Sequence, residues 1–168
     1  MSIIIRKAKV GDEKGIAKIF EEGLKRKNFI YNGSNKSPDT NKLKKMRDSY
    51  REPGHISFVA VDPNNKKIVG NIHGGFKLTG RIRHRVDIGW MVHPDYQGRG
   101  IATKLLKALL VEAKKKGLKR AEAECAVANV ASWKLAKKCG FKIEGKKIKA
   151  LITDDGKSID TYIVGRLL

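Results

Sequence analysis

The sequence contains few cysteines, prolines and aromatic residues. Its 168 residues include two cysteines, four prolines and 7% aromatic residues. Cys125 and Cys139 are too few for a disulfide framework and lack a metal-ligand spacing, which predicts a reducing, cytoplasmic location. No apolar run approaches the roughly 18 residues that span a bilayer. The first residues also lack the basic segment, apolar stretch and cleavage site of a signal peptide. We therefore expect neither a secreted disulfide-rich protein nor a membrane protein.

Acidic residues are also scarce relative to basic ones. The chain has 17 aspartates and glutamates against 37 lysines and arginines, which gives a formal net charge of +20. A positive field of this size attracts polyanions such as nucleic acid, ribosomes or phosphorylated cofactors. The alternative is an ordinary solvated surface rich in lysine. Because the lysines are spread along the chain without an aromatic-interleaved RNA-binding motif, the charge alone leaves both interpretations open.

Hydrophobic periodicity predicts one domain, over residues 1–168, in which strands and helices alternate. We expect strands at residues 2–9, 55–62, 68–76, 82–92, 119–127, 141–151 and 158–167. Helices are expected to begin near Asp12, at Pro38 with Ser37 as its cap, near Ile101 and at Asn129. The third helix has one apolar stripe, formed by Leu105, Leu106, Leu109, Leu110 and Ala113. This order of elements is typical of a single α+β or α/β domain.

A glycine-containing turn, Gln97-Gly98-Arg99-Gly100-Ile101-Ala102, joins a predicted strand to a predicted helix. The first turn of a helix has unpaired amides and a partial positive charge, so it can hold an anion. Gly98 and Gly100 allow a phosphate to approach the backbone closely. An ATP-type phosphate loop requires Lys and then Ser or Thr after the last glycine, but here Gly100 is followed by Ile101 and Ala102. A dinucleotide fingerprint requires a third glycine at position 103, which is Thr103. A plain strand-to-helix turn is the remaining local alternative.

The residues around this turn resemble the GCN5-related N-acetyltransferase (GNAT) superfamily. The central motif of that family, Gln/Arg-x-x-Gly-x-Gly/Ala, is matched by Gln97, Gly100 and Ala102, after the usual lead-in Val92-His93-Pro94-Asp95-Tyr96. Its second signature is matched by Asn129, Leu135 and Gly140-Phe141. The resemblance covers essentially the whole chain and is nearest to the branch that acetylates the N-termini of ribosomal proteins. It implies a central mixed, mostly antiparallel sheet, splayed at the cofactor site and flanked by about four helices.

The resemblance also implies a set of residues that bind acetyl-CoA. The backbone of Met91 and Val92 would pair with the pantetheine arm between two splayed strands and polarise the thioester carbonyl. Asn129 would contact the arm from the following helix, although a role as a simple N-cap is an equal alternative. Ser132, in the same helix, is a further predicted cofactor-binding residue. The pyrophosphate would lie on the turn formed by Gln97, Gly98, Arg99, Gly100, Ile101, Ala102 and Thr103.

Direct attack of an amine on the thioester needs a base, because an ammonium ion has no lone pair. Glu124 matches the base position of the ribosomal-protein acetyltransferases, and Asp87 matches a carboxylate that other branches use. Glu122 alternates onto the same face as Glu124. Where the family often has a tyrosine as general acid, this chain has Ala136. Ser132, Tyr162 or water can take that role, or the weakly basic thiolate needs no acid.

The function that these observations predict is transfer of an acetyl group from acetyl-CoA to a primary amine of a small molecule or a protein N-terminus. Residues 28–37 are expected to line the acceptor side. The alternative is a non-catalytic module on the same fold that binds CoA, nucleic acid or the ribosome. The basic charge is compatible with ribosome or nucleic-acid proximity and unfavourable for a polyamine acceptor. A homodimer is a further expectation, and membrane association is not expected.

Overall fold

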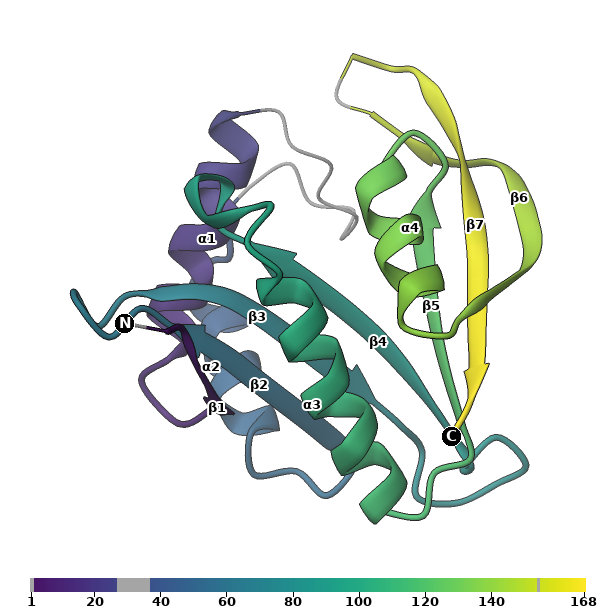
Figure 1. Cartoon of the computed structure of the whole chain (residues 1–168), viewed down its shortest axis with the longest axis horizontal. Helices are drawn as coiled ribbons and strands as arrows, with labels where there is room; N and C mark the ends of the chain where they lie inside the picture. The colour runs from purple at the N-terminus through teal and green to yellow at the C-terminus, as the bar shows by residue number, and fades with distance from the viewer. Residues whose placement is uncertain (1, 27–36, 154) are drawn as a thin grey trace.

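The computed structural model describes residues 2–26, 37–153 and 155–168, which form one seven-stranded sheet and four α-helices (Figure 1). The order of elements agrees with the sequence prediction. In chain order they are β1 (Ile4–Lys7), α1 (Glu13–Lys25), α2 (Thr40–Ser49), β2 (His55–Val61), β3 (Ile68–Gly75), β4 (Arg85–Val92), the 3₁₀ turn η1 (Pro94–Tyr96), α3 (Ile101–Lys115), β5 (Arg120–Ala126), α4 (Val130–Lys138), β6 (Lys142–Ile152) and β7 (Ser158–Leu167).

The sheet has the strand order β1-β2-β3-β4-β5-β7-β6, and every neighbouring pair is antiparallel except β4 and β5. These two parallel strands pair only where Arg85–Asp87 lies beside Arg120–Glu122. Beyond Asp87 they diverge, and Figure 1 shows the resulting V between the two halves of the sheet. The predicted mixed, mostly antiparallel and splayed sheet with four helices is therefore confirmed.

The apolar stripe of α3 forms the centre of the core on one face of the sheet. Its predicted members are all buried, as is Ile101 at the start of the helix. Removing these side chains from water stabilises the fold by roughly 25 cal/mol per Å² of apolar surface. The helix lies close to the sheet because β3 has glycine beneath it. A Cβ at Gly74 would lie 2.7 Å from Cγ2 of Val86 and 3.3 Å from Cδ1 of Leu109. In Figure 1, α3 and α4 lie in front of the sheet and α2 lies behind it.

One predicted helix start was wrong, and a second predicted cap has the expected position without the expected hydrogen bond. The second helix begins after Asp39, whose carboxylate accepts a hydrogen bond of 2.8 Å from the N–H of Lys42, so Ser37-Pro38 precedes the helix instead of starting it. Asp12 stands at the N-cap position of α1, but its side chain makes no cap. Its oxygens instead accept hydrogen bonds from the guanidinium of Arg6, at 2.6 and 2.8 Å, because the adjacent strand brings a cation within reach.

Two predicted strands are shorter than expected by three residues or more. The first strand spans only the residues that pair with β2, from Ile4 to Lys7. The fourth begins at Arg85 instead of residue 82, because the preceding residues form a turn in which the N–H of Arg83 donates to the carbonyl of Gly80. Both differences lie at strand ends, where alternation alone does not show which residues find a partner.

Candidate cofactor and catalytic site

Both glycines of the turn have a left-handed backbone conformation. Gly98 has φ +74° and Gly100, the N-cap of α3, has φ +73°. For any other residue this conformation costs roughly 1–2 kcal/mol, so the turn requires glycine for its backbone shape. A Cβ at either position would meet nothing within 4 Å. The space above both glycines is therefore open to a ligand.

The N–H groups of residues 98–103 point to no acceptor within the part of the chain that the structure describes. The first amide of α3 with a partner is that of Lys104, which donates to the carbonyl of Gly100 at 3.1 Å. These unpaired donors lie at the N-terminal end of a 15-residue helix, where the helix dipole places partial positive charge. Such a cluster of donors is suited to the oxygens of a phosphate group.

Tyr96 anchors the residues that lead into this turn. Its hydroxyl donates a hydrogen bond of 2.7 Å to Asp62, at the end of β2, and this bond lowers the pKa of the Asp62 carboxyl. The guanidinium carbon of Arg99 lies 4.9 Å from the centre of the Tyr96 ring, and the same group donates to the carbonyl of Asp95 at 2.8 Å. This role of Tyr96 is not visible in the sequence, because its partner Asp62 is 34 residues away.

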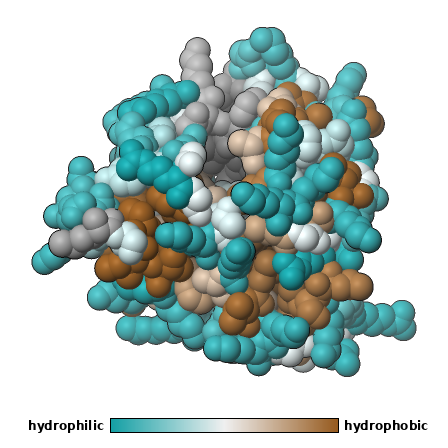
Figure 2. Space-filling model, in the orientation of Figure 1, coloured by the Kyte–Doolittle hydropathy of each residue, from teal (hydrophilic) through white to brown (hydrophobic). Residues whose placement is uncertain are grey.

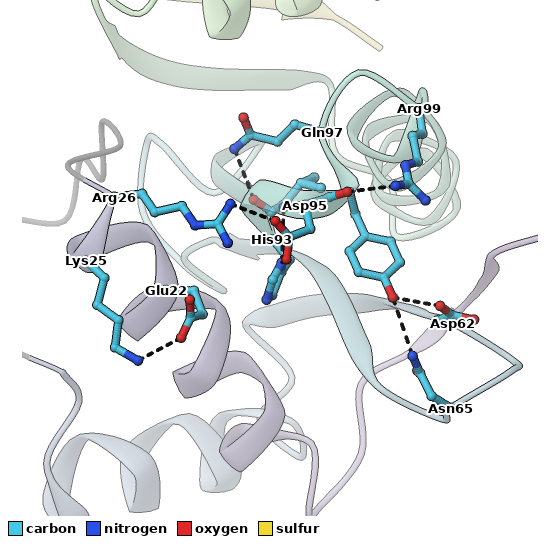
Figure 3. A network of polar contacts seen from close by, with 11 residues as sticks. Glu22, Lys25, Arg26, Asp62, Asn65, His93, Asp95, Gln97 and Arg99 are labelled. Carbon is cyan, nitrogen blue, oxygen red and sulfur yellow. Dashed lines mark hydrogen bonds and ion pairs between the residues drawn. The ribbon is translucent and has the colours of Figure 1, made fainter.

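A second contact connects the turn to α1. Arg26, directly after that helix, forms an ion pair of 2.6 Å with Asp95 (Figure 3). Gln97 does not point into open space: its Nε2 donates to the carbonyl of Val92 at 3.3 Å. The motif glutamine thus joins the two ends of the η1 segment. Both contacts hold the turn in place beside the end of β4.

Met91 and Val92 lie on the open edge of β4. On one side they pair with Asn71 and Gly70 of β3, and on the other side β5 has already diverged. The molecular surface is hollowed where the two halves of the sheet separate (Figure 2). The glycine turn follows this strand directly, so the open edge and the unpaired amides are continuous. This arrangement can receive an extended chain with a phosphate at one end.

Asn129 is the N-cap of α4, as its local alternative predicted. Its Oδ1 accepts a hydrogen bond of 3.2 Å from the N–H of Ser132, whose hydroxyl donates to the sulfur of Cys125 at 3.4 Å. Burial raises the pKa of the Cys125 thiol, which keeps it protonated. Ala136 is completely buried in the same helix. Cofactor contact by Asn129 or Ser132 remains a prediction.

The three candidate carboxylates lie on one face of the sheet but differ in their partners. Glu122 is bound by Arg120 at 2.5 Å and by Arg85 at 3.3 Å, which indicates a structural role. Glu124 is 19% exposed, accepts a hydrogen bond from the buried Thr161, and forms an ion pair of 2.8 Å with Lys147.

Asp87 differs from both glutamates, because it is exposed and has no polar partner among the described residues. It lies opposite Glu122, where β4 and β5 separate. Tyr162 packs edge-on against Trp133 of α4, with ring centres 5.9 Å apart. Of residues 28–37, only Ser37 is among the residues that the structure describes.

The divided sheet, the open strand edge and the amide-lined turn together define an α/β domain of the class that binds an extended, phosphorylated acyl carrier. Residues 22–141 match the model of the acetyltransferase (GNAT) family, and the chain belongs to that family. It is therefore an acetyl-CoA-dependent N-acetyltransferase, as the sequence predicted.

Several known proteins are similar to this chain. The L-methionine sulfoximine/L-methionine sulfone acetyltransferase of Pseudomonas aeruginosa is 29% identical over 146 residues, which cover 87% of this chain and 84% of that protein. A phosphinothricin acetyltransferase from Sinorhizobium meliloti, solved with acetyl-CoA, has a TM-score of 0.88 and 22% identity over 100% of this chain and 89% of its own. A ribosomal-protein-alanine N-acetyltransferase from Brucella melitensis has a TM-score of 0.87 and 22% identity over 98% of this chain and 99% of its own. At these identities the two solved structures show the fold.

No helix among the described residues is long and apolar enough to cross a membrane.

Proposed function

We propose that the turn from Gly98 to Thr103 holds the pyrophosphate of acetyl-CoA, with the acyl arm lying along Met91 and Val92. The observation that carries this proposal is the run of unpaired amides at the start of α3, directly beside the open edge of β4. Hydrogen bonds from these N–H groups and the helix dipole act together on the phosphate oxygens. Arg99, held against Tyr96, adds a cation next to them. Gln97 supports the turn, and Asn129 and Ser132 border the gap from α4.

In the proposed reaction the acceptor nitrogen attacks the thioester carbon and the C–S bond breaks. The ammonium form of the acceptor first gives its proton to a carboxylate, either directly or through water. We assign this role to Glu124, because Thr161 and Lys147 hold its carboxylate in one position. Asp87 is the rival base, on the same face of the sheet and without these supports. As the C–S bond breaks, the nitrogen loses its second proton to solvent and becomes a neutral amide. The departing thiolate takes a proton from solvent, because Ala136 has none to donate.

The acceptor that we propose is the α-amino group of a small amino acid. The Pseudomonas relative, which covers most of the chain, acts on methionine sulfoximine and methionine sulfone. The positive field of this chain favours an acceptor that carries a carboxylate and opposes a free polyamine. A protein N-terminus is the second candidate, since the Brucella neighbour acetylates ribosomal-protein alanine.

The setting of the reaction is also part of the proposal. We infer a cytoplasmic enzyme on the basis of its two buried free cysteines. Proximity to ribosomes or nucleic acid is inferred from the excess of basic residues. A homodimer remains a prediction, which sedimentation at two protein concentrations tests directly.

The proposed acceptor is tested with matched panels of amino acids, N-terminal peptides and polyamines. Acetyl transfer is followed by release of the CoA thiol at two salt concentrations. We expect a small neutral or acidic amino acid to have the highest kcat/KM, and we expect its advantage over spermidine to decrease as salt screens the field. Spermidine as the best acceptor at low salt would refute this assignment. A peptide as the best acceptor would replace it with the N-terminal one.

A further inference from the structure

A cluster of exposed cations lies at the end of the sheet remote from the glycine turn. It comes from the β3–β4 loop and from the end of α3 with the residues that follow it, two segments that lie side by side in Figure 1. Helix α3 begins at the glycine turn and ends in this cluster, so about 22 Å of helix separate the two. We call this surface the basic patch, and its members are Lys77, Arg81, Arg83, Lys114, Lys115, Lys116 and Lys119.

Backbone hydrogen bonds hold the two segments of the basic patch together. The carbonyl of His84 accepts from the N–H of Lys119 at 2.7 Å and from the N–H of Arg120 at 3.2 Å. Within the loop, the guanidinium of Arg83 donates to the carbonyl of Gly80 at 3.0 Å. The positive charges of the two segments are therefore held together as one surface, although they are more than 30 residues apart in the chain.

Ion pairs do not compensate the charges of the basic patch within the described part of the chain, and Glu112 acts on Lys115 and Lys116 only by longer-range attraction. None of its seven side chains forms an ion pair there, whereas Lys146 and Lys147 of β6 each bind a carboxylate. Glu112, the acidic residue next to the patch in α3, is already bound by Lys7 at 2.7 Å. Cations at the C-terminal end of a helix are favoured by the helix dipole, which accounts for those at the end of α3. It does not account for the cations of the neighbouring loop.

We propose that the basic patch docks the phosphate backbone of double-stranded RNA. Arginine and lysine side chains without ion-pair partners are the groups that contact phosphates, and the guanidinium of Arg81 can bind two phosphate oxygens at once. The loop that contributes to the patch contains Phe76, but this ring packs against the core and is not free for unpaired bases to stack on, which favours a duplex over a single strand. Exposed apolar side chains near the patch include Leu78 and Ile82 of the loop and Leu167, next to Leu168, whose N–H donates to the carbonyl of Lys119 at 2.9 Å, so a membrane surface is the rival partner in the test below. In Figure 2, hydrophilic side chains project from this end of the molecule.

The proposed docking is independent of the acceptor and of the base. It leaves the glycine turn and the splayed strands open, because the patch lies at the other end of α3 and β4. An enzyme held on RNA in this way keeps its catalytic face exposed to substrates. The seven cations also set an upper limit on the salt dependence, since each neutralised phosphate adds about −0.9 to the slope of log K against log salt on duplex DNA.

The test measures binding of a fluorescent RNA hairpin of about 20 base pairs to the full chain between about 50 and 200 mM salt. The patch variant combines Lys77→Gln, Arg81→Gln, Lys115→Gln and Lys119→Gln, none of which removes a side-chain contact. The control variant removes the same number of charges from α1 and α2, by Lys14→Gln, Lys18→Gln, Lys44→Gln and Lys45→Gln.

We expect the patch variant to bind RNA at least roughly tenfold more weakly than the wild type. Its slope of log K against log salt should be shallower by about three, and the affinity and slope of the control variant should change much less. Both variants are expected to acetylate a small free amine at the wild-type rate.

Three outcomes would overturn the proposal. Equal weakening in both variants would assign the binding to the diffuse charge of the whole chain. No measurable RNA binding at about 150 mM salt would show that the patch is a solvated surface. Tighter binding to vesicles containing phosphatidylserine than to RNA, lost in the patch variant, would identify a membrane surface as the partner. The RNA titration tests only the basic patch, and the panel of amines tests only the proposed acceptor. A negative result in one experiment therefore leaves the other proposal unaffected.

Discussion

The hydroxyl of Tyr96 donates a hydrogen bond of 2.7 Å to Asp62, and this contact ties the segment before the glycine turn to the end of β2. The ring of Tyr96 carries the guanidinium of Arg99 on its face. One tyrosine therefore positions both the backbone before the turn and the cation within it.

Replacing Tyr96 with phenylalanine removes the hydroxyl and keeps the ring. Because hydrogen bonds to a carboxylate are stronger than those between neutral groups and this one holds the segment before the turn, we expect acetyl-CoA affinity to fall by about three- to tenfold. The rate at saturating acetyl-CoA should change little, since no reacting atom is touched. Titration calorimetry with acetyl-CoA and steady-state kinetics separate the two effects. Asp62→Asn should reproduce them, and a fall in kcat alone would contradict a positioning role.

The glycine turn is tested by Gly100→Val. Valine at φ +73° is strained by about 1–2 kcal/mol, and its side chain enters the space above the amides. Wild-type protein at about a hundred times the dissociation constant of acetyl-CoA should gain roughly 2.7 kcal/mol of stability, measured by thermal unfolding. The variant should fold but lose this gain. Gly117→Val is the matched control, because Gly117 also has a positive φ, +78°, and open space but lies at the other end of α3. An undiminished gain in the Gly100 variant would remove the turn from the cofactor site.

The base is tested by Glu124→Gln, which keeps the shape of the side chain and removes its ability to accept a proton. We expect kcat to fall roughly a hundredfold or more, with acetyl-CoA binding retained. Asp87→Asn is the test of the rival, and it should have a small effect. Lys147→Met, which removes the cation beside Glu124, separates proton transfer from simple loss of the ion pair. If neither carboxamide variant lowers the rate, the amine loses its proton by another route.

The close contact between β3 and α3 predicts that adding a single methyl group at Gly74 lowers the free energy of unfolding. In Gly74→Ala the new methyl group would lie 2.7 Å from Val86, so the strand or the helix must move. Overpacking of this kind typically costs 1–3 kcal/mol, which urea unfolding measures as a lower midpoint at unchanged slope. Gly75→Ala is the control, because a Cβ there meets nothing within 4 Å. Equal destabilisation by both changes would mean that loss of backbone freedom, and not packing, is responsible.

The Arg6–Asp12 contact predicts sensitivity to acid. Burial alone would raise the pKa of Asp12, but hydrogen bonds from Arg6 and from the N–H of Lys9 outweigh it and hold the pKa below its ordinary value. An unfolded aspartate has a pKa of about 3.9, so this contact stabilises the fold above about pH 4 and is lost as the pH falls through the lower folded value. Asp12→Asn should lower Tm at neutral pH and make its decrease below about pH 4 less steep. Parallel melting curves that differ by a constant Tm at every pH would contradict this assignment.

Much of the fold could be predicted because its signals are local. The period of Leu105, Leu109 and Ala113 reports a buried helix face whatever lies beneath it. The glycines at positions 98 and 100 show a turn that demands positive φ, directly before a helix. Strand limits were less accurate, since a strand ends where its partner ends and that partner is distant in the chain.

The residues of the candidate site were predicted one by one from two short motifs. The hydrogen-bond and ion-pair partners of these residues were not predicted. Local sequence was sufficient for the amide-lined turn, the cap at Asn129 and the shared face of Glu122 and Glu124, because backbone geometry over a few residues decides each of these. Only the tertiary structure decided that Glu122 is bound by two arginines while Glu124 is held by Thr161 and Lys147. The same holds for Tyr96 reaching Asp62 and for the joining of two basic segments at the basic patch. Electrostatic and hydrogen-bonding partners depend on distances in space of a few ångströms, and the packing of strands far apart in the chain determines those distances.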